Sequence, residues 1–249
     1  MAYDPSRIRL FVEDDLEAGA SVSLHRDQVH YLRNVMRRHD GDKVFLFNGR
    51  DGEWCTEIAQ LDKKACTLTL GEQLRDQTTP SDIWLLFAPV KRARLDYIAQ
   101  KATELGVSVI QPVITQRTNV GRVNVERLRA NAVEAAEQCR CLSVPEVRET
   151  AALAEILSEW PSQRRLIMCD EEGGVPLPQA ISEGGETAGG WAVLVGPEGG
   201  FSDSERSELE KVSALSRVSL GSRILRADTA VVAVLSVWQA LRGDWYEEG

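Results

Sequence analysis

From residue 83 onward, apolar runs alternate with amphipathic segments, a pattern that few folds can accommodate. Residues 83–90 (IWLLFAPV) are continuously apolar, as expected for a strand buried on both faces of a parallel sheet. Residues 92–105 place their apolar side chains on one helical face, and Gly106 stops the helix. The alternation continues over residues 107–114, 128–139, 166–170, 191–196, 209–215, 217–220 and 229–241. It predicts an α/β domain with a parallel sheet over residues 83–249.

Residues 1–71 follow a different pattern, which predicts a small β domain. Three short stretches alternate polar and apolar residues as strands do: 43–47, 54–58 and 65–70. Four apolar residues at helical spacing predict one helix between these strands: Val29, Leu32, Val35 and Met36. Residues 72–82 are polar and contain a proline, so they are the predicted linker between the two domains.

Composition excludes several classes of protein. With 43% hydrophobic residues the chain is not disordered, and its net charge of 29 − 38 = −9 argues against a protein that coats nucleic acid or membrane by bulk charge. No secretory signal is visible, and the apolar stretch 230–241, about 12 residues, is shorter than the roughly 18–20 that span a bilayer. A cytoplasmic protein without membrane contact is expected. The five cysteines and three histidines lack metal-site spacing, which favours reduced thiols and no metal.

A glycine-rich loop, GPEGGF at residues 196–201, follows the apolar stretch 191–195. Ser202 and Glu205 have the spacing of a capping box, so a helix is predicted to start at Ser202 and the loop to lie at the carboxyl end of a parallel strand. Ligands bind at such strand ends, although a tight turn kept short for packing is the alternative. The spacing fits neither a P-loop nor a dinucleotide site. Because five acids and Arg206 leave a local charge of about −4, a neutral or cationic ligand is favoured over phosphate.

A second loop, residues 220–230 (LGSRILRADTA), joins the next strand to the last apolar helix. Asp228 or Thr229 is the predicted N-cap of that helix. Both loops are predicted to leave the same side of the sheet, where Leu220, Ile224 and Leu225 suit a flat base such as adenine. The arginines at 223 and 226 either face an anionic partner or lie in solvent.

Together these motifs closely resemble those of RsmE, the family of 16S ribosomal RNA uridine methyltransferases. The resemblance spans nearly the whole chain and rests on GPEGGFSDSE, LGSRILRADTA, KATELGV at 101–107, AAEQCR at 135–140 followed by Pro145, and RxRxF at residues 7–11. It implies a SPOUT-type catalytic domain with a C-terminal trefoil knot and a PUA-like N-terminal RNA-binding domain. It also implies a homodimer, S-adenosylmethionine as methyl donor, and N3 of one uridine in the small ribosomal subunit as the methyl acceptor.

The resemblance also implies which residues form the site. The cofactor-binding residues would be Cys169, Gly196, Pro197, Glu198, Gly199, Gly200, Leu220, Gly221, Ile224, Leu225, Arg226, Thr229 and Ala230. Arg226 is the candidate catalytic residue, since the uridine ring becomes negatively charged as N3 loses its proton. Family members commonly have glutamate where this chain has Asp228.

RNA would be held by cations of the N-terminal domain and of the start of the catalytic domain: Arg7, Arg9, His30, Arg33, Arg37, Lys91, Arg92 and Arg94. Two rival functions remain. A nucleotide-dependent transferase or Rossmann-type methyltransferase would carry its glycine loop after the first strand of the domain, whereas here it lies near residue 196. A non-catalytic RNA-binding or ribosome-assembly factor with the same fold is the other alternative.

Overall fold

The computed structural model describes residues 7–119, 122–185 and 189–245, and of Arg92 the backbone only. The chain divides into two compact units. Unit 1 comprises residues 1–79 and 136–144, and unit 2 comprises residues 80–135 and 145–249. The division at residues 79 and 80 lies inside the stretch predicted as linker, but the return of residues 136–144 to unit 1 was not foreseen.

Unit 1 is built on a five-stranded sheet in the order β1-β3-β4-β5-β2. The strands are β1 (Arg9–Phe11), β2 (Ser21–Ser23), β3 (Lys43–Phe47), β4 (Glu53–Leu61) and β5 (Cys66–Arg75). Residues 43–47, 54–58 and 65–70 are therefore strand as predicted, except that β5 begins at Cys66 and runs into the first residues of the expected linker. Alternate apolar residues such as Val22, Val44 and Leu68 form the core.

The predicted helix of unit 1 is present as α1 (Arg26–His30), which continues into a π-helical turn, η1 (Tyr31–Val35). Val29 and Leu32 are fully buried, whereas Val35 is exposed. The wider π-turn moves Val35 out of the apolar face that a regular helix would have given it.

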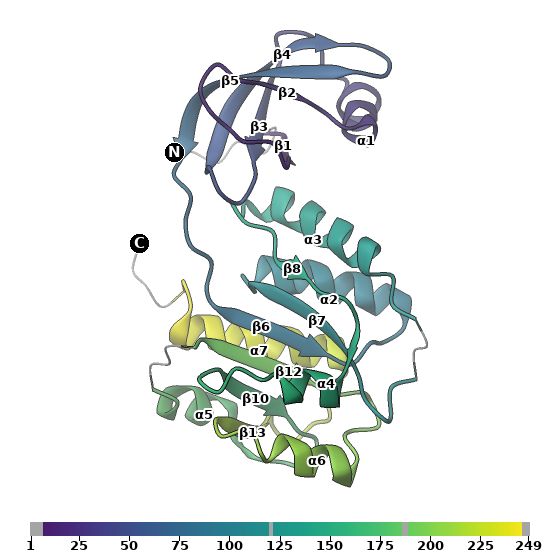
Figure 1. The fold of residues 1–249 in the computed structure, drawn as a ribbon, viewed down its shortest axis with the longest axis vertical. Coiled ribbons are helices and arrows are strands. Elements are labelled where there is room, and N and C mark those ends of the chain that lie inside the picture. Colours follow the sequence, from purple (N-terminus) through teal and green to yellow (C-terminus); the bar gives the residue numbers. More distant parts are fainter. Residues whose placement is uncertain (1–6, 120–121, 186–188, 246–249) are drawn as a thin grey trace. The chain divides into compact units, whose positions relative to one another are not determined.

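Unit 2 contains the predicted parallel sheet, and its main strands are seen in Figure 1. The strand order is β11-β13-β10-β12-β6-β7-β8, and β9 pairs with β7. The bounds are β6 (Ile83–Phe87), β7 (Val109–Ile114), β8 (Glu146–Val147), β9 (Ala151–Ala152), β10 (Arg165–Cys169), β11 (Val175–Pro176), β12 (Trp191–Val195) and β13 (Leu215–Ser219). All of these pairings are parallel.

Helices cover both faces of this sheet. They are α2 (Arg92–Glu104), α3 (Val125–Cys139), α4 (Leu153–Ser158), α5 (Leu177–Glu183), α6 (Asp203–Leu209) and α7 (Ala227–Arg242). Helices α2 and α5 pack against α7, and α4 packs against α6. Leu86, Leu194 and Leu209 belong to the core that also takes in Leu153 of α4.

Two local expectations are wrong and a third is confirmed. Residues 209–215 are not an element of their own, because α6 ends at Leu209 and turns lead to β13. The N-cap of α7 is Arg226, without a side-chain hydrogen bond, so the prediction of Asp228 or Thr229 is wrong. The capping box at Ser202 is confirmed: Ser202 Oγ accepts from the Glu205 amide at 3.2 Å, and the Glu205 carboxylate accepts from the Ser202 amide at 2.9 Å.

Candidate active site

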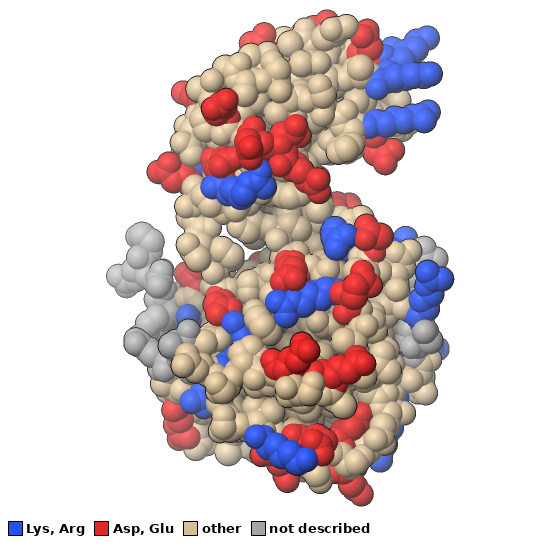
Figure 2. Space-filling view, in the orientation of Figure 1, with Lys and Arg blue, Asp and Glu red and all other residues tan. Residues whose placement is uncertain are grey.

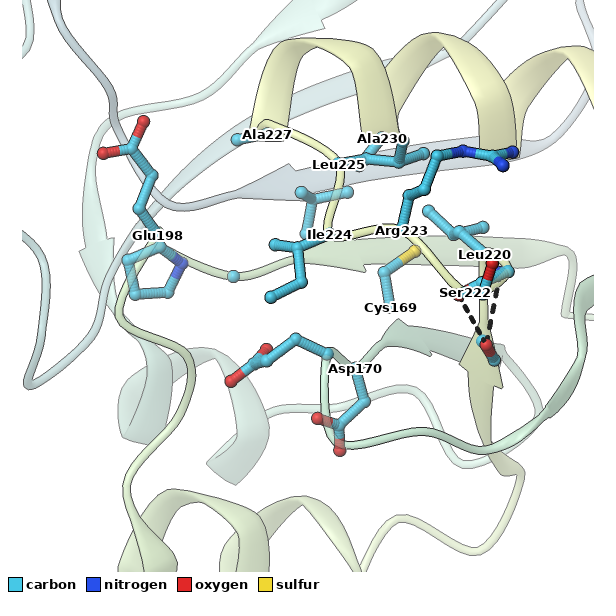
Figure 3. Close-up of a pocket in the computed structure, with 16 residues that line it drawn as sticks. Cys169, Asp170, Glu198, Leu220, Ser222, Arg223, Ile224, Leu225, Ala227 and Ala230 are labelled. Atoms are coloured by element: carbon cyan, nitrogen blue, oxygen red, sulfur yellow. Dashed lines mark hydrogen bonds between the residues drawn. The ribbon is translucent and has the colours of Figure 1, made fainter.

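A cavity of about 180 Å³ opens where three neighbouring parallel strands end. Strands β13, β10 and β12 lie side by side, and the loop that follows each of them forms one wall (Figure 3). The residues that line the cavity are Cys169, Asp170, Glu171, Val195, Gly196, Pro197, Glu198, Ser219, Leu220, Gly221, Ser222, Arg223, Ile224, Leu225, Ala227 and Ala230. This confirms that the two predicted loops leave the same side of the sheet.

The loop after β13 supplies the apolar wall. Leu220, Leu225 and Ala230 lie along it, and Figure 3 shows Ile224 projecting toward the loop that carries Asp170. Ile224 is 86% exposed, an unusual state for a large apolar side chain, and it therefore offers a surface that a planar apolar group can cover. The loop is braced at its start, where the Gly221 amide donates to Ser219 Oγ at 3.2 Å.

The glycine loop after β12 forms one wall of the cavity and is also tightly packed against neighbouring side chains. Gly196 lines the cavity, and any side chain there would collide with Phe201, because a Cβ atom would lie 2.7 Å from the ring. Gly200 has φ +67° and its Cβ would meet Glu171 Oε1. The alternative explanation for the glycines, that they allow tight packing, therefore holds at both positions. Pro197 and Glu198 line the cavity, whereas Gly199 and Gly200 do not.

The third wall comes from the end of β10. Burial, together with the charge of Asp170, raises the pKa of Cys169 to about 12, so this thiol is a neutral wall of the cavity rather than a nucleophile. Cys169 was predicted to lie here. The next two residues, Asp170 and Glu171, also line the cavity and were missed, although their place directly after a buried strand is the signal that would have found them.

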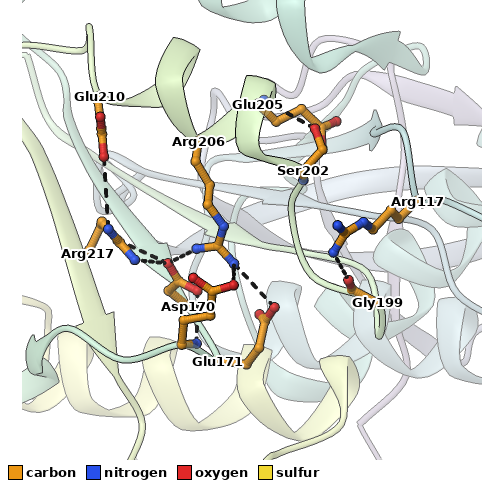
Figure 4. A network of polar contacts seen from close by, with 10 residues as sticks. Arg117, Asp170, Glu171, Gly199, Ser202, Glu205, Arg206, Glu210 and Arg217 are labelled. Carbon is orange, nitrogen blue, oxygen red and sulfur yellow. Dashed lines mark hydrogen bonds and ion pairs between the residues drawn. The ribbon is translucent and has the colours of Figure 1, made fainter.

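A buried ion cluster holds this third wall in place. The Asp170 side chain is fully buried, and Arg206 of α6 and Arg217 of β13 both donate to its Oδ2 (Figure 4). Burial alone would raise the pKa of Asp170, but its hydrogen bonds to the Glu172 amide and the two guanidinium groups lower it. Arg206 also approaches Glu171 at 3.4 Å. The cluster thus joins β10, β13 and α6 beside the cavity.

Two arginines connect the glycine loop to other elements of unit 2. Arg94 of α2 donates to Glu198 Oε1 at 2.8 Å and lies 3.7 Å from Asp228 Oδ2. Arg117, after β7, donates to the Gly199 carbonyl at 2.7 Å. Glu205 serves the capping box and also accepts from the Gln116 amide at 2.7 Å. Several of the acidic residues counted around the loop are therefore bound by other groups of the protein. The glutamates that line the cavity are Glu171 and Glu198.

Two other predicted cofactor residues lie off the cavity lining. Arg226 and Thr229 are both exposed at the start of α7. Arg226 caps the helix through its backbone, leaving its side chain outside the cavity wall and open to an approaching molecule.

The predicted RNA-binding residues of unit 1 divide into two groups. Arg9 is buried, and its Nε donates to Glu53 Oε1 at 2.5 Å, while its two other nitrogens donate to the carbonyl groups of residues 136, 137 and 141. Arg7 lies 3.7 Å from Glu53 and 3.8 Å from the centre of the Phe45 ring. Arg9 therefore stabilises the interior of unit 1 and is not available to RNA.

The second group lies on the surface of unit 1. His30 and Arg37 are exposed, and Arg33 is half-buried. Asn34 approaches His30 Nδ1 at 2.9 Å, and Arg37 has φ +52°, a left-handed conformation that is uncommon outside glycine. Of the residues of unit 1 that were predicted to bind RNA, these three are the ones that do not pair with Glu53.

The predicted cations of unit 2 lie around the start of α2. Lys91 is exposed, and Arg94 is engaged with Glu198. The side chain of Arg92 lies outside the described part of the chain. On the face of unit 2 in Figure 2, acidic and basic side chains are interspersed. The described residues on this face therefore form no extended basic patch.

Neither a metal centre nor a membrane span is found among the residues that the structure describes. In that part of the chain, histidine, cysteine and acidic side chains form no group of three suited to a metal ion. No helix there has the length and apolar character needed to cross a membrane.

Comparison with known proteins identifies the family. Residues 77–239 match the RNA methyltransferase domain, and residues 24–71 match the RNA methyltransferase PUA domain. The chain is 31% identical over 235 residues to the ribosomal RNA small subunit methyltransferase E of Rickettsia conorii, covering 92% of this chain and 93% of that protein.

Solved structures agree with this assignment. The ribosomal RNA small subunit methyltransferase E of Neisseria gonorrhoeae, bound to S-adenosylmethionine, is 29% identical and superposes with a TM-score of 0.84 over 94% of this chain and 98% of that one. A Legionella pneumophila methyltransferase in complex with the same cofactor is 28% identical, with a TM-score of 0.83 over 94% and 97% of the two chains. The fold is accordingly a SPOUT-type parallel-sheet domain with a PUA-like β domain, and the chain belongs to the ribosomal RNA small subunit methyltransferase E family.

Proposed function

We propose that this protein transfers a methyl group from S-adenosylmethionine to N3 of one uridine in 16S ribosomal RNA of the small subunit. The proposal rests on the cavity at the ends of β13, β10 and β12, which has an apolar wall facing acidic residues. The Rickettsia and Neisseria relatives are small-subunit RNA methyltransferases, and two similar structures hold S-adenosylmethionine.

The residues of the cavity fit this cofactor. Leu220, Leu225 and Ala230 provide an apolar surface for the adenine, and the exposed Ile224 can cover it. Glu171 and Glu198 place negative charge beside a ligand whose sulfonium is positive. When bound, the cofactor supplies an electrophilic methyl group. The neutral Cys169 thiol lines the cavity without competing as a nucleophile.

Arg226 is the proposed catalytic residue. Uridine N3 is a poor nucleophile while protonated, so the reaction benefits from a cation that stabilises the negative charge left on the ring. The Arg226 side chain is exposed beside the cavity wall, as such a role requires. We expect Arg226→Ala to lower kcat about 10²- to 10³-fold with the dissociation constant for S-adenosylmethionine unchanged, and Arg226→Lys to retain more activity. Equal loss in both variants, or none, would contradict the role.

RNA is proposed to bind unit 1 through His30, Arg33 and Arg37, which lie within the segment matched by the PUA domain. Reversing the charges of Arg33 and Arg37 should weaken RNA binding and flatten its salt dependence without changing affinity for S-adenosylmethionine. Lys63→Glu is the matched control, because Lys63 is also exposed on unit 1 but lies in the turn between β4 and β5. RNA binding that is unaltered by reversal at Arg33 and Arg37 would reject this surface.

The remaining features implied by the family are proposed with the function: a cytoplasmic homodimer whose C-terminal domain contains a trefoil knot. A dimer allows unit 1 of one subunit, through Arg33 and Arg37, to present RNA to the cavity of the other. Light scattering of the purified protein measures the mass of the assembly, and a monomer at working concentration would remove the dimer from the proposal.

The decisive experiment uses small ribosomal subunits from a strain that lacks the enzyme. Incubation with the protein and S-adenosylmethionine, followed by mapping of the modified base, should yield N3-methyluridine at one site. A different methylated base would overturn the substrate assignment. Calorimetry separates the non-catalytic alternative, since an assembly factor without the methyltransferase function would bind small subunits but not S-adenosylmethionine.

A further inference from the structure

Two cysteines lie together where α3 ends. Cys139 is the last residue of α3, Cys141 follows two residues later, and their sulfur atoms are 3.3 Å apart. Both side chains are half-buried, within the segment 136–144 that belongs to unit 1. The five cysteines are all thiols in this structure.

The turn that joins the two cysteines is fixed from several sides. Arg140 between them has φ +65°, a left-handed conformation that reverses the chain at the end of the helix. Its carbonyl accepts from Arg75 Nη2 at 3.0 Å, and the Cys141 carbonyl accepts from Arg9 Nη2 at 2.7 Å. Both guanidinium groups also bind the buried Glu53. The interior of unit 1 thus holds the backbone that brings the sulfur atoms together.

Arg9 is a cation that interacts with Cys139. Burial lowers the pKa of Arg9, and the negative charge of Cys139 is among the influences that oppose this lowering, so the two groups interact electrostatically. A neighbouring cation stabilises a thiolate, which is the form that attacks oxidants and disulfides.

We propose that Cys139 and Cys141 form a redox-active dithiol, which a peroxide converts to an intrachain disulfide. The Cys139 thiolate attacks one peroxide oxygen and the O–O bond breaks, giving a sulfenic acid and a hydroxide that takes up a proton to become water. The Cys141 thiolate then attacks that sulfur, forming the S–S bond and releasing a second hydroxide, which is protonated likewise. Two thiols are oxidised and one peroxide is reduced to two waters.

Two other cysteines provide an internal contrast. Burial raises the pKa of Cys66 to about 11 and that of Cys169 to about 12; Cys66 lies in the core of unit 1, and Cys169 is buried at the wall of the cavity. These thiols should resist oxidation under conditions in which the pair reacts. Cys55 on β4 is half-buried and is the internal competitor whose labelling is compared with that of the pair.

Tryptic digestion can detect this disulfide specifically, because the two cysteines fall in different peptides. Trypsin cleaves after Arg129, Arg140 and Arg148, which places Cys139 in peptide 130–140 and Cys141 in peptide 141–148. The full-length protein is treated with an equimolar amount of hydrogen peroxide, its remaining thiols are alkylated, and the denatured protein is digested and analysed by mass spectrometry. We expect peptides 130–140 and 141–148 to be joined, lighter than their sum by two hydrogen atoms, and to separate on reduction.

Single variants distinguish the two steps. In Cys141→Ser, peroxide should leave a sulfenic acid on Cys139 that dimedone labels, whereas Cys139→Ser should show little labelling at Cys141. Circular dichroism and thermal unfolding check that each variant is folded. The proposal is overturned if the two peptides remain unlinked while Cys55 is oxidised, or if Cys139 proceeds to a sulfinic acid in the wild-type protein without forming the disulfide.

Discussion

The two units each contain a fully buried carboxylate that accepts hydrogen bonds from two arginines, and the two carboxylates have different roles. In unit 1, Glu53 is bound by Arg9 and Arg75, and this cluster ties β1, β4 and β5 to the end of α3. In unit 2, Asp170 is bound by Arg206 and Arg217 beside the candidate cofactor cavity. The same chemistry stabilises an interior in one unit and positions a ligand wall in the other.

The difference lies in what the arginines do with their remaining donors. Arg9 directs them to backbone carbonyl groups inside unit 1, so the whole guanidinium is enclosed. Arg206 extends toward Glu171 and Glu172, whose side chains are 37% and 62% exposed. Solvent therefore weakens the second cluster and leaves its acidic edge open to a ligand.

Glu53→Gln should have the largest effect on folding, because it leaves the buried Arg9 without a counter-charge. Breaking such a pair costs about 3–5 kcal/mol in the free energy of unfolding, measured by urea denaturation. Affinity for S-adenosylmethionine should not change in the fraction that remains folded, since the cavity belongs to unit 2. Asp15→Asn, which breaks an exposed pair with Arg50, is the control and should change stability by less than about 1 kcal/mol.

Asp170→Asn should have the opposite pattern to Glu53→Gln: a smaller loss of stability and a clear loss of cofactor affinity. We expect a smaller loss of stability, about 2–3 kcal/mol, because Arg206 keeps its ion pairs with Glu171 and Glu172 when Asp170 is replaced by a neutral residue. Calorimetry should show affinity for S-adenosylmethionine reduced about tenfold, a change of roughly 1.4 kcal/mol, since Asp170 and its neighbour Glu171 line the cavity. Unaltered cofactor affinity in a folded Asp170→Asn protein would show that the two clusters do not differ in function.

Gly200→Ala tests the contact between the glycine loop and Glu171. The left-handed conformation and the collision with Glu171 should together lower stability by about 1–3 kcal/mol and weaken cofactor binding by moving Glu171. Gly199→Ala is a matched control in the adjacent position, since its Cβ would meet Arg117 only at 3.6 Å, an ordinary contact. Thermal unfolding that is equal in the two variants would refute the packing explanation for Gly200.

Acid should weaken both clusters, because the folded protein lowers the pKa of Glu53 and that of Asp170. Burial alone would raise both pKa values, and hydrogen bonds, from Arg75 and Arg9 in the case of Glu53, outweigh it. The stability is fully present above the unfolded carboxylate pKa, about 4, and is lost as the pH falls through the folded values. Urea midpoints should therefore decrease as the pH falls below about 4, and less steeply in Glu53→Gln. A variant slope as steep as that of the wild type would exclude this contribution.

Much of the organisation was predictable from local pattern. The run 83–87 is apolar throughout because β6 is covered on both faces, and the S-x-x-E spacing located the start of α6 because a capping box is made within four residues. The two loops that line the cavity were found because they follow apolar runs. The third wall was only half found: Cys169 was predicted because it ends a recognisable strand, but Asp170 and Glu171 were missed although they follow that strand directly.

The order of the elements, the position of the glycine loop and the family of the chain could be read from the amino-acid sequence, because each depends on neighbouring residues or on a specific motif. Which charges are buried could not. Arg9 and Arg33 look alike as cations in the sequence, yet Glu53, 44 residues after Arg9, draws Arg9 into the interior. The return of residues 136–144 to unit 1 likewise depends on Arg9 and Arg75 binding carbonyl groups far along the chain. Contacts between distant residues, which arise only when the chain is folded, separated the structural arginines from those available to a ligand.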